Sequence, residues 1–296
     1  MRALAEFVMR GRTQAAIAAA LGGFLPLVSA AVVALVVMRR GLSDGFIVFL
    51  WALLPAVLLV VFYGTGDSSL FVLSLAPVVT LIVTMLAAVV LRITASWQKA
   101  VVVSVLCGVL AALSLQLFLA AHLDAVVQSV SEVFLEISQE RTRQGIGDVP
   151  LSSPDKFFIV GALAYSCTLN ALLCLVLARW WQASLYNPGG FQAEFHQLRL
   201  GHLQALLLLG PVIYCLLVNN YSGSWGYLAA LPFLFSGIAL VHWLVKQRHF
   251  GGIWLVIFYI ALIFSQPVVL LTVGIALLDS FFDFRGRWRS IGSGSA

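Results

Sequence analysis

The sequence predicts an all-α, polytopic membrane protein, a helix bundle with six to eight transmembrane segments. Hydrophobic residues make up 61% of its 296 residues and charged residues only 10%, and the mean hydropathy is +1.03. These values exclude an ordinary soluble domain. The apolar residues also gather in runs of about 20, the length that a helix needs to cross a bilayer. Because lipid cannot satisfy free backbone groups, each run must be mainly helical.

Eight such runs can be counted along the chain, and the first and last are interrupted by Gly or Pro. Gly22, Gly23 and Pro26 stand in the middle of the first run, and Gln266 and Pro267 in the last. A helix break at membrane depth is tolerated only where protein or a wet cavity surrounds it. We therefore expect both broken runs to border a polar or hydrated space. The runs cover about residues 15–38, 44–63, 69–91, 100–121, 156–178, 203–221, 224–245 and 252–278.

The positions of Lys and Arg separate two topologies. If all eight runs cross the bilayer, nine of these residues fall on one side and eight on the other, which gives no orientation. If the two broken runs are shallow re-entrant hairpins, the division becomes fourteen against three. Such an excess is typical of the cytoplasmic side. This second topology predicts a multi-pass protein of the bacterial inner membrane with cytoplasmic termini, whereas eight straight, kinked spans would leave the orientation open.

A long polar connection, at about residues 123–155, is expected on the outer face because its charge is mostly acidic. Val126, Val130, Val133, Phe134 and Ile137 recur in it at helical spacing. This periodicity predicts an amphipathic helix that lies on the membrane or caps the bundle. A simple packed linker and a lid over a cavity both remain open as its role.

The connection after the fifth run predicts a short interfacial helix on the inner side. Trp180 and Trp181 are expected at the membrane edge, where such aromatic rings gather. The segment from Asn187 to Gly190 is a turn signal, and Phe191 and the residues after it carry the apolar positions of the short helix.

The rest of the composition limits the protein to one membrane-embedded domain over residues 1–291. The closing Gly-Ser-Gly-Ser-Ala, residues 292–296, is typical of an expression tail. Catalytic motifs are absent, so we expect no enzyme activity. The scattered His and Cys residues predict neither a metal site nor a cofactor, and the four cysteines are expected as small core residues. Basic residues stand at the ends of runs, so nucleic acid is not an expected partner.

The C-terminal sequence LLDSFFDFRGRW holds the most informative polar cluster. Asp279 and Asp283 share a helix face at i, i+4 and repel each other unless a cation lies between them. Arg285, Arg39 and Arg40 are the candidate partners. One interpretation is a charged ring at the inner mouth that binds an anionic headgroup. The other is a structural clasp that ties the first and last elements together.

Neutral polar residues are the remaining candidates for ligand contact within the runs. Asn170 lies in the middle of a run, so it must pair with another helix or line a cavity. Gln266 and Pro267 stand beside a carbonyl that the proline leaves free, as in the broken helices of transporters. Pro26 marks the corresponding break in the first run.

Small residues recur four apart on the first run, as Ala15/Ala19 and Ala16/Ala20. This spacing allows another helix to approach closely. The partner is either a helix of the same chain or a separate membrane subunit.

Three stretches together resemble the YybS-like family of bacterial membrane proteins: the Pro-interrupted first run followed by RRGLSDG, the ARWWQASLYNPGGFQAEFHQLRL connection, and the closing GIALLDSFFDFRGRW. That family is similar to the substrate-binding S components of energy-coupling-factor transporters. The resemblance implies a bundle of about six helices that binds a small molecule near the outer face. It also implies docking to a membrane-coupling subunit through Ala15, Ala16, Ala19 and Ala20. Eight runs exceed six, and no ligand motif is present that would identify a substrate.

We therefore expect a non-catalytic binding or transport subunit for a small or lipid-like molecule, surrounded by membrane lipids. The expected ligand-contact residues are Pro26, Arg39, Arg40, Asn170, Gln266, Pro267, Asp279, Asp283 and Arg285. Two alternatives remain: a structural or regulatory scaffold that docks a partner protein, and a lipid-phosphate translocator in which Arg39, Arg40 and Arg285 meet the phosphate.

Overall fold

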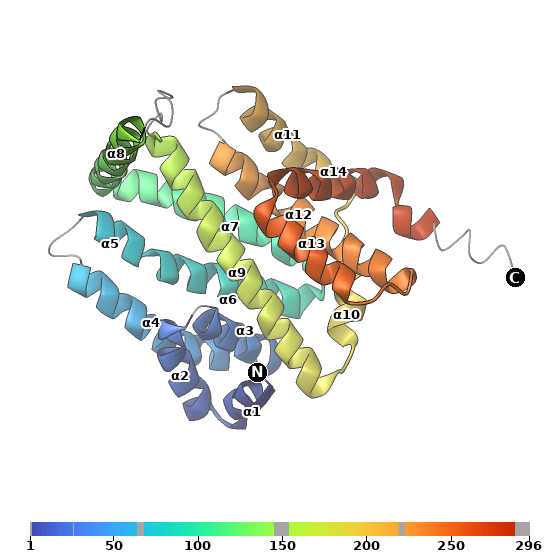
Figure 1. Cartoon of the computed structure of the whole chain (residues 1–296). Helices are drawn as coiled ribbons and strands as arrows, with labels where there is room; N and C mark the ends of the chain where they lie inside the picture. Colours follow the sequence, from blue (N-terminus) through green and yellow to red (C-terminus); the bar gives the residue numbers. More distant parts are fainter. Residues whose placement is uncertain (1, 26, 64–67, 145–153, 219–222, 288–296) are drawn as a thin grey trace, which may run out of the picture.

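The computed structural model describes residues 2–25, 27–63, 68–144, 154–218 and 223–287, which form helices and contain no strand (Figure 1). The expected all-α bundle is confirmed. Its elements are α1 (Arg2–Arg10), α2 (Arg12–Leu21), η1 (Gly22–Phe24), α3 (Val28–Arg40), α4 (Leu42–Tyr63), α5 (Ser68–Ser74), α6 (Ala76–Thr94), α7 (Trp97–Phe118), α8 (Ala120–Arg143), α9 (Lys156–Tyr186), α10 (Gly190–Phe195), α11 (His202–Val218), α12 (Gly223–Gln247), α13 (Ile253–Phe264) and α14 (Gln266–Phe282).

Five helical stretches among the described residues are long and apolar enough to cross a membrane, which makes this a multi-pass membrane protein. They are α4, α5 with α6, α7, α9 and α12. The pair α13 and α14 passes the same test together but is bent by 112° at Ser265. The shorter apolar helix α11 begins beside α7, where Gln98 donates a hydrogen bond to Gln204.

The first broken run folds back on itself as a hairpin of α2 and α3. At its open end, Arg12 at the start of α2 pairs with Asp44, just beyond α3, at 2.7 Å. Near its tip, Ser29 Oγ donates to the carbonyl of Ala19 at 2.8 Å. Ten residues of α2 and 13 of α3 correspond to about 15 and 20 Å, less than the roughly 30 Å of a bilayer core. The run therefore enters and leaves at the same end of the bundle.

Helix α3 is the centre of the fold. Every side chain from Ala30 to Met38 is buried, because α2, α4, α6 and α9 surround this helix. A helix that is apolar on all sides, as this one is, is typical of such a position.

The second broken run also reverses direction, but it lies at the edge of the bundle. Helix α13 has no buried residue, and α14 packs on α11, α12 and α13. Tyr259 of α13 meets His242 of α12 at 2.8 Å. Helix α12 therefore separates this second hairpin from α9 and the centre of the bundle.

The bundle has two chemically different ends, and α9 runs from one to the other (Figure 1). We call one the basic end. There Arg39 lies over the ring of Tyr186, 4.2 Å from its centroid, and Arg40 donates to the carbonyl of Met9. Lys246, at the end of α12, donates to Gln192 of α10.

At the opposite end, which we call the acidic end, Lys156 of α9 pairs with Asp124 of α8 at 2.7 Å. Trp225, at the start of α12, donates to the carbonyl of Phe157. Of the described Lys and Arg residues, only Arg141, Arg143 and Lys156 belong to elements of this end.

The positions of the two ends show which helices connect them. Helix α11 starts at the basic end and α12 starts at the acidic end, so α11 joins the two ends. Among the described residues, six helical stretches thus connect the two ends: α4, α5 with α6, α7, α9, α11 and α12. Most of the described Lys and Arg residues lie at the basic end.

Both polar connections contain a helix where they are described, as their sequence patterns predicted. Helix α8 covers residues 120–143 at the acidic end, and its first turns are anchored by buried Leu123 and Val126. Helix α10 is short and packs its Phe191 and Phe195 rings against Trp97. Residues 145–153 and the tail at 292–296 lie outside the described residues.

Candidate functional site: a cavity at the tip of the first hairpin

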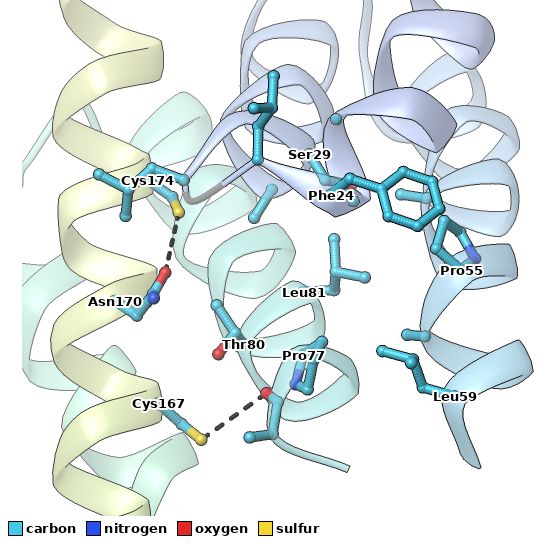
Figure 2. A pocket seen from close by; sticks show the side chains of 18 of the residues that line it. Phe24, Ser29, Pro55, Leu59, Pro77, Thr80, Leu81, Cys167, Asn170 and Cys174 are labelled. Carbon is cyan, nitrogen blue, oxygen red and sulfur yellow. Dashed lines mark hydrogen bonds between the residues drawn. The ribbon is translucent and has the colours of Figure 1, made fainter. Parts of the chain in front are cut away.

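A cavity of about 420 Å³ lies between the tip of the α2–α3 hairpin and helices α4, α6 and α9 (Figure 2). We call it the hairpin-tip cavity. Pro55 and Leu59 face it from α4, and Thr80 and Leu81 from α6. Its wall on α9 is formed by Ser166, Cys167, Asn170 and Cys174. The cavity lies within the membrane-crossing part of the bundle, between the hairpin tip and the acidic end.

Two glycines allow the tip to pack closely. A Cβ at Gly22 would lie 2.9 Å from Val28 Cγ1, where the chain turns back, and a Cβ at Gly23 would lie 2.8 Å from Pro55 Cγ. Both distances are too short for real Cβ contacts. The Gly-Gly pair in the first run is therefore required by contact on two sides. Leu27 completes the turn with a φ of +67°, in the left-handed region that L residues rarely adopt.

Two further irregularities of the backbone border the same cavity. Pro55 lies inside α4, and because it has no N–H, the carbonyl four residues earlier loses its helical donor. The second is the break between α5 and α6, where Leu75 forms a turn and Pro77 lies in the first turn of α6. Cys167 of α9 contacts this break through a long hydrogen bond from its thiol to the carbonyl of Ala76, 3.7 Å. Irregular backbone from three elements thus meets at one cavity.

Asn170 is the most polar group on the wall. Its side chain is exposed although it lies in the middle of the 31-residue helix α9, because it faces the cavity (Figure 2). The amide oxygen accepts a hydrogen bond from the thiol of Cys174 at 3.4 Å. The amide nitrogen makes no hydrogen bond to a described residue, so its two N–H donors are open to a ligand or to water.

The lining contains no Asp, Glu, Lys, Arg or His among the described residues. The hydroxyl groups of its two serines donate to backbone carbonyls of their own surroundings: Ser29 to Ala19 and Ser166 to Ala162. The cavity therefore offers a few neutral donors and acceptors within mainly apolar walls, a combination typical of sites for small or amphiphilic molecules.

Of the ligand-contact residues predicted from the sequence that the structure describes, only Asn170 lines this cavity. Pro26 lies outside the described residues, although its neighbours Leu25 and Leu27 line the cavity. Gln266 and Pro267 were expected beside a hydrated space, and they do not line this cavity. Gln266 donates to the hydroxyl of Tyr227 at the edge of the bundle, and α12 separates it from the cavity.

The C-terminal cluster forms a clasp within the last third of the chain. Asp279 is fully buried and Arg285 nearly so, with Nε 3.4 Å from Oδ2. Arg285 also donates to the carbonyls of His196 and Ser236. Asp283 pairs separately with Arg199. The backbone N–H of Gly286, the largest influence, and Arg199 hold the pKa of the Asp283 carboxyl below its ordinary value.

Arg39 and Arg40 do not take part in that clasp. They lie at the end of α3, against Tyr186 and the carbonyl of Met9. The expectation that they pair with the C-terminal aspartates was therefore wrong, as was the expected tie between the first and last elements. Because Arg285 lies with α12, the three arginines do not meet to form a phosphate site.

The alanines predicted as a docking stripe are used within the chain. Ala15 and Ala19 are completely buried and Ala16 is buried, against helices that include α1, α3 and α4. Ala20 is partly buried. Internal packing, one of the two interpretations of this pattern, is the role that the structure shows.

The sequence analysis did not single out Pro55, Pro77, Cys167 or Cys174 as site residues. Both prolines interrupt apolar runs, as Pro26 does, and this is a signal that was available. The cysteines lie three before and four after Asn170, which places all three on one helix face. All four cysteines of the chain are free thiols. Comparison with protein-family models, with curated proteins and with solved structures gives no match.

Proposed function

We propose that this chain is a non-catalytic binding or carrier protein of the bacterial inner membrane, which holds a neutral small or lipid-like molecule in the hairpin-tip cavity. In this proposal the basic end faces the cytoplasm and the acidic end faces outward. The excess of Lys and Arg at the basic end supports this orientation.

The observation that carries the proposal is the convergence of irregular backbone on a cavity that holds an unsatisfied amide. The hairpin tip leaves the helical pattern, Pro55 removes one backbone donor inside α4, and a turn at Leu75 separates α5 from α6. All three border the space that Asn170 faces. Backbone of this kind is stable at membrane depth only beside protein or a hydrated cavity, and membrane transporters use it to contact substrates.

Native mass spectrometry of gently extracted protein tests the proposal. We expect a bound molecule of defined mass that survives gentle activation. Asn170→Leu removes the free amide donors at similar size and should lower the occupancy about tenfold, the effect of losing about 1.4 kcal/mol. Ser184→Ala is the control, because Ser184 lies on the same helix and bonds only to the carbonyl of Trp181. Repeated absence of any bound molecule from the wild type would refute the proposal.

A further inference from the structure

A second cavity of about 440 Å³ lies on the outer surface of the bundle between α6 and α7. We call it the α6–α7 groove. Its lining is apolar apart from Ser114, whose hydroxyl donates to the carbonyl of Leu110, and the thiol of Cys107. Leu110 is 62% exposed and Phe118 77%, as expected for side chains that face lipid. The groove lies in the half of the bundle nearer the acidic end, because α7 ends at Phe118.

A small void of about 10 Å³ lies between the hairpin-tip cavity and the groove. It shares Ala76 and Cys167 with the cavity. It shares Leu75, Val79, Ala111 and Leu115 with the groove. The three spaces are therefore neighbours beside the turn between α5 and α6, and the side chains that line them in common separate them.

The side chains and backbone around the small void are suited to the passage of a ligand between the hairpin-tip cavity and the α6–α7 groove. Ala76 and Ala111 are small, so little volume closes the gap. Pro77 has no N–H to donate, so the carbonyl four residues before it lacks a helical partner. At the turn itself, the N–H of Leu75 bonds to the carbonyl of Val72 at 3.2 Å. The helical hydrogen-bond pattern is thus interrupted where the cavity and the groove come closest.

From this adjacency we infer the class of ligand, an inference that rests on the proposed function. The ligand is an uncharged amphiphile with one long apolar chain. Its polar end hydrogen-bonds to the Asn170 amide in the hairpin-tip cavity. Its chain passes between Ala76, Ala111 and Cys167 and lies in the α6–α7 groove. The same passage is its entrance from the bilayer.

The residues that line the cavity and the groove favour an uncharged amphiphile over an anionic molecule or a compact water-soluble molecule. The absence of charged side chains among the described lining residues disfavours an anionic head, because a buried charge without a partner is costly. A compact water-soluble molecule would fill only the hairpin-tip cavity and would leave the apolar α6–α7 groove unoccupied. A chain in that groove, by contrast, remains in apolar surroundings along its whole length.

Photolabelling with a long-chain fatty alcohol tests the inference in the purified protein in lipid nanodiscs. One probe carries a diazirine next to the hydroxyl, and a second carries it next to the terminal methyl. We expect the first to label the wall of the cavity near Asn170 and Pro55. We expect the second to label the groove near Ile82 and Leu110. Peptide mass spectrometry locates both.

Two variants test the passage itself. Ala111→Trp fills the void and should lower head-probe labelling of the cavity about tenfold, a difference of about 1.4 kcal/mol. Leu113→Trp, two residues along α7 at a 50% exposed position outside the groove lining, should leave it unchanged. Leu75→Ala widens the gap between the cavity and the groove and should speed head-probe labelling of the cavity. This variant tests the passage even if Ala111→Trp misfolds.

The outcomes separate this inference from the proposed function. If both probes label only the cavity, the chain does not enter the groove, and the inference is wrong while the proposed function stands. Equal head labelling in Ala111→Trp and Leu113→Trp would also refute the passage. Labelling of the groove alone by both probes would mean ordinary surface lipid and would refute both proposals.

Discussion

Gly23 of the hairpin tip lies against Pro55 of α4, so close that a Cβ on the glycine would be 2.8 Å from Cγ of the proline ring. Two interruptions of the helical pattern, 32 positions apart in the sequence, thus fit together. The glycine lets the tip approach α4, where the ring of Pro55 lies against it. This contact closes one side of the hairpin-tip cavity.

Gly23→Ala should lower the stability of the protein and displace the tip. The proline ring is part of the backbone of α4 and cannot move away as a flexible side chain does, so the added methyl group overpacks the contact. We expect a loss of about 1–3 kcal/mol in the free energy of unfolding, measured by thermal unfolding in detergent. Gly274→Ala, in α14 with no atom within 4 Å of the new Cβ, should be neutral or stabilising. An unchanged stability for Gly23→Ala would show that the tip packs less closely than described.

The buried clasp should respond strongly to the loss of one partner. Arg285→Met leaves the carboxylate of Asp279 in a buried position without its cation, so we expect a loss of about 3–5 kcal/mol. Replacing both residues, as Asp279→Leu with Arg285→Met, should recover most of this loss because no unpaired charge remains. The unfolding temperatures of the single and the double variant test this prediction. The single variant should unfold at the lowest temperature, and the double variant should unfold closer to the wild type.

Arg199→Met is the matched control for the clasp. Its partner Asp283 has 52% of its side chain exposed, so water screens the pair and its loss should cost less than about 1 kcal/mol. A cost as large as that of Arg285→Met would contradict the assignment of the buried pair as the stronger tie.

Stability should fall between pH 7 and pH 5 because of His196. Burial first, and then the positive charges of Lys246, His242 and Arg285, lower the pKa of His196 from 6.5 to about 4. Below pH 6.5 the unfolded chain therefore binds a proton that the folded chain does not bind until about pH 4, and acidification favours unfolding. We expect a loss of about 1–2 kcal/mol over this range.

His196→Gln tests that origin, because glutamine does not titrate. The variant should lose less stability than the wild type between pH 7 and pH 5, whatever its stability at pH 7. His249→Gln, a change at an exposed position of the same end, controls for the removal of a histidine. If His196→Gln and the wild type lose the same stability on acidification, another group is responsible.

The sequence was sufficient for the framework of the fold because its dominant signal is local. Each apolar run of about 20 residues became a helix or a broken pair, since lipid leaves a backbone few alternatives. The breaks at Gly22–Gly23 and at Ser265 were also recognisable, because glycine and proline act on their own turn of helix. The distribution of Lys and Arg favoured six crossing runs, and this topology stays a prediction.

The site was less accessible to such reasoning because it depends on what packs beside each break. Pro26 and Pro267 carry the same local signal, yet the first break borders a cavity and the second lies behind α12. Likewise, spacing places Cys167 and Cys174 on the helix face of Asn170 without revealing that this face meets an open space. Only the crossing of α4, α6 and α9 around the hairpin creates that space.

The orientation of the bundle is the last prediction, and labelling from one side of the membrane tests it. In a variant without the four native cysteines, Glu136→Cys on α8 should react with a membrane-impermeant maleimide on intact cells, because the acidic end is expected to face outward. Gln247→Cys, at the basic end of α12, should react only after permeabilisation. Both positions are exposed, so access to the reagent, rather than burial, decides the result.

Equal reaction of Gln247→Cys in intact cells would overturn the orientation. Because the basic residues at that end are the argument for it, such a result would mean that their role is contact with other parts of the chain, as Arg40 makes with Met9.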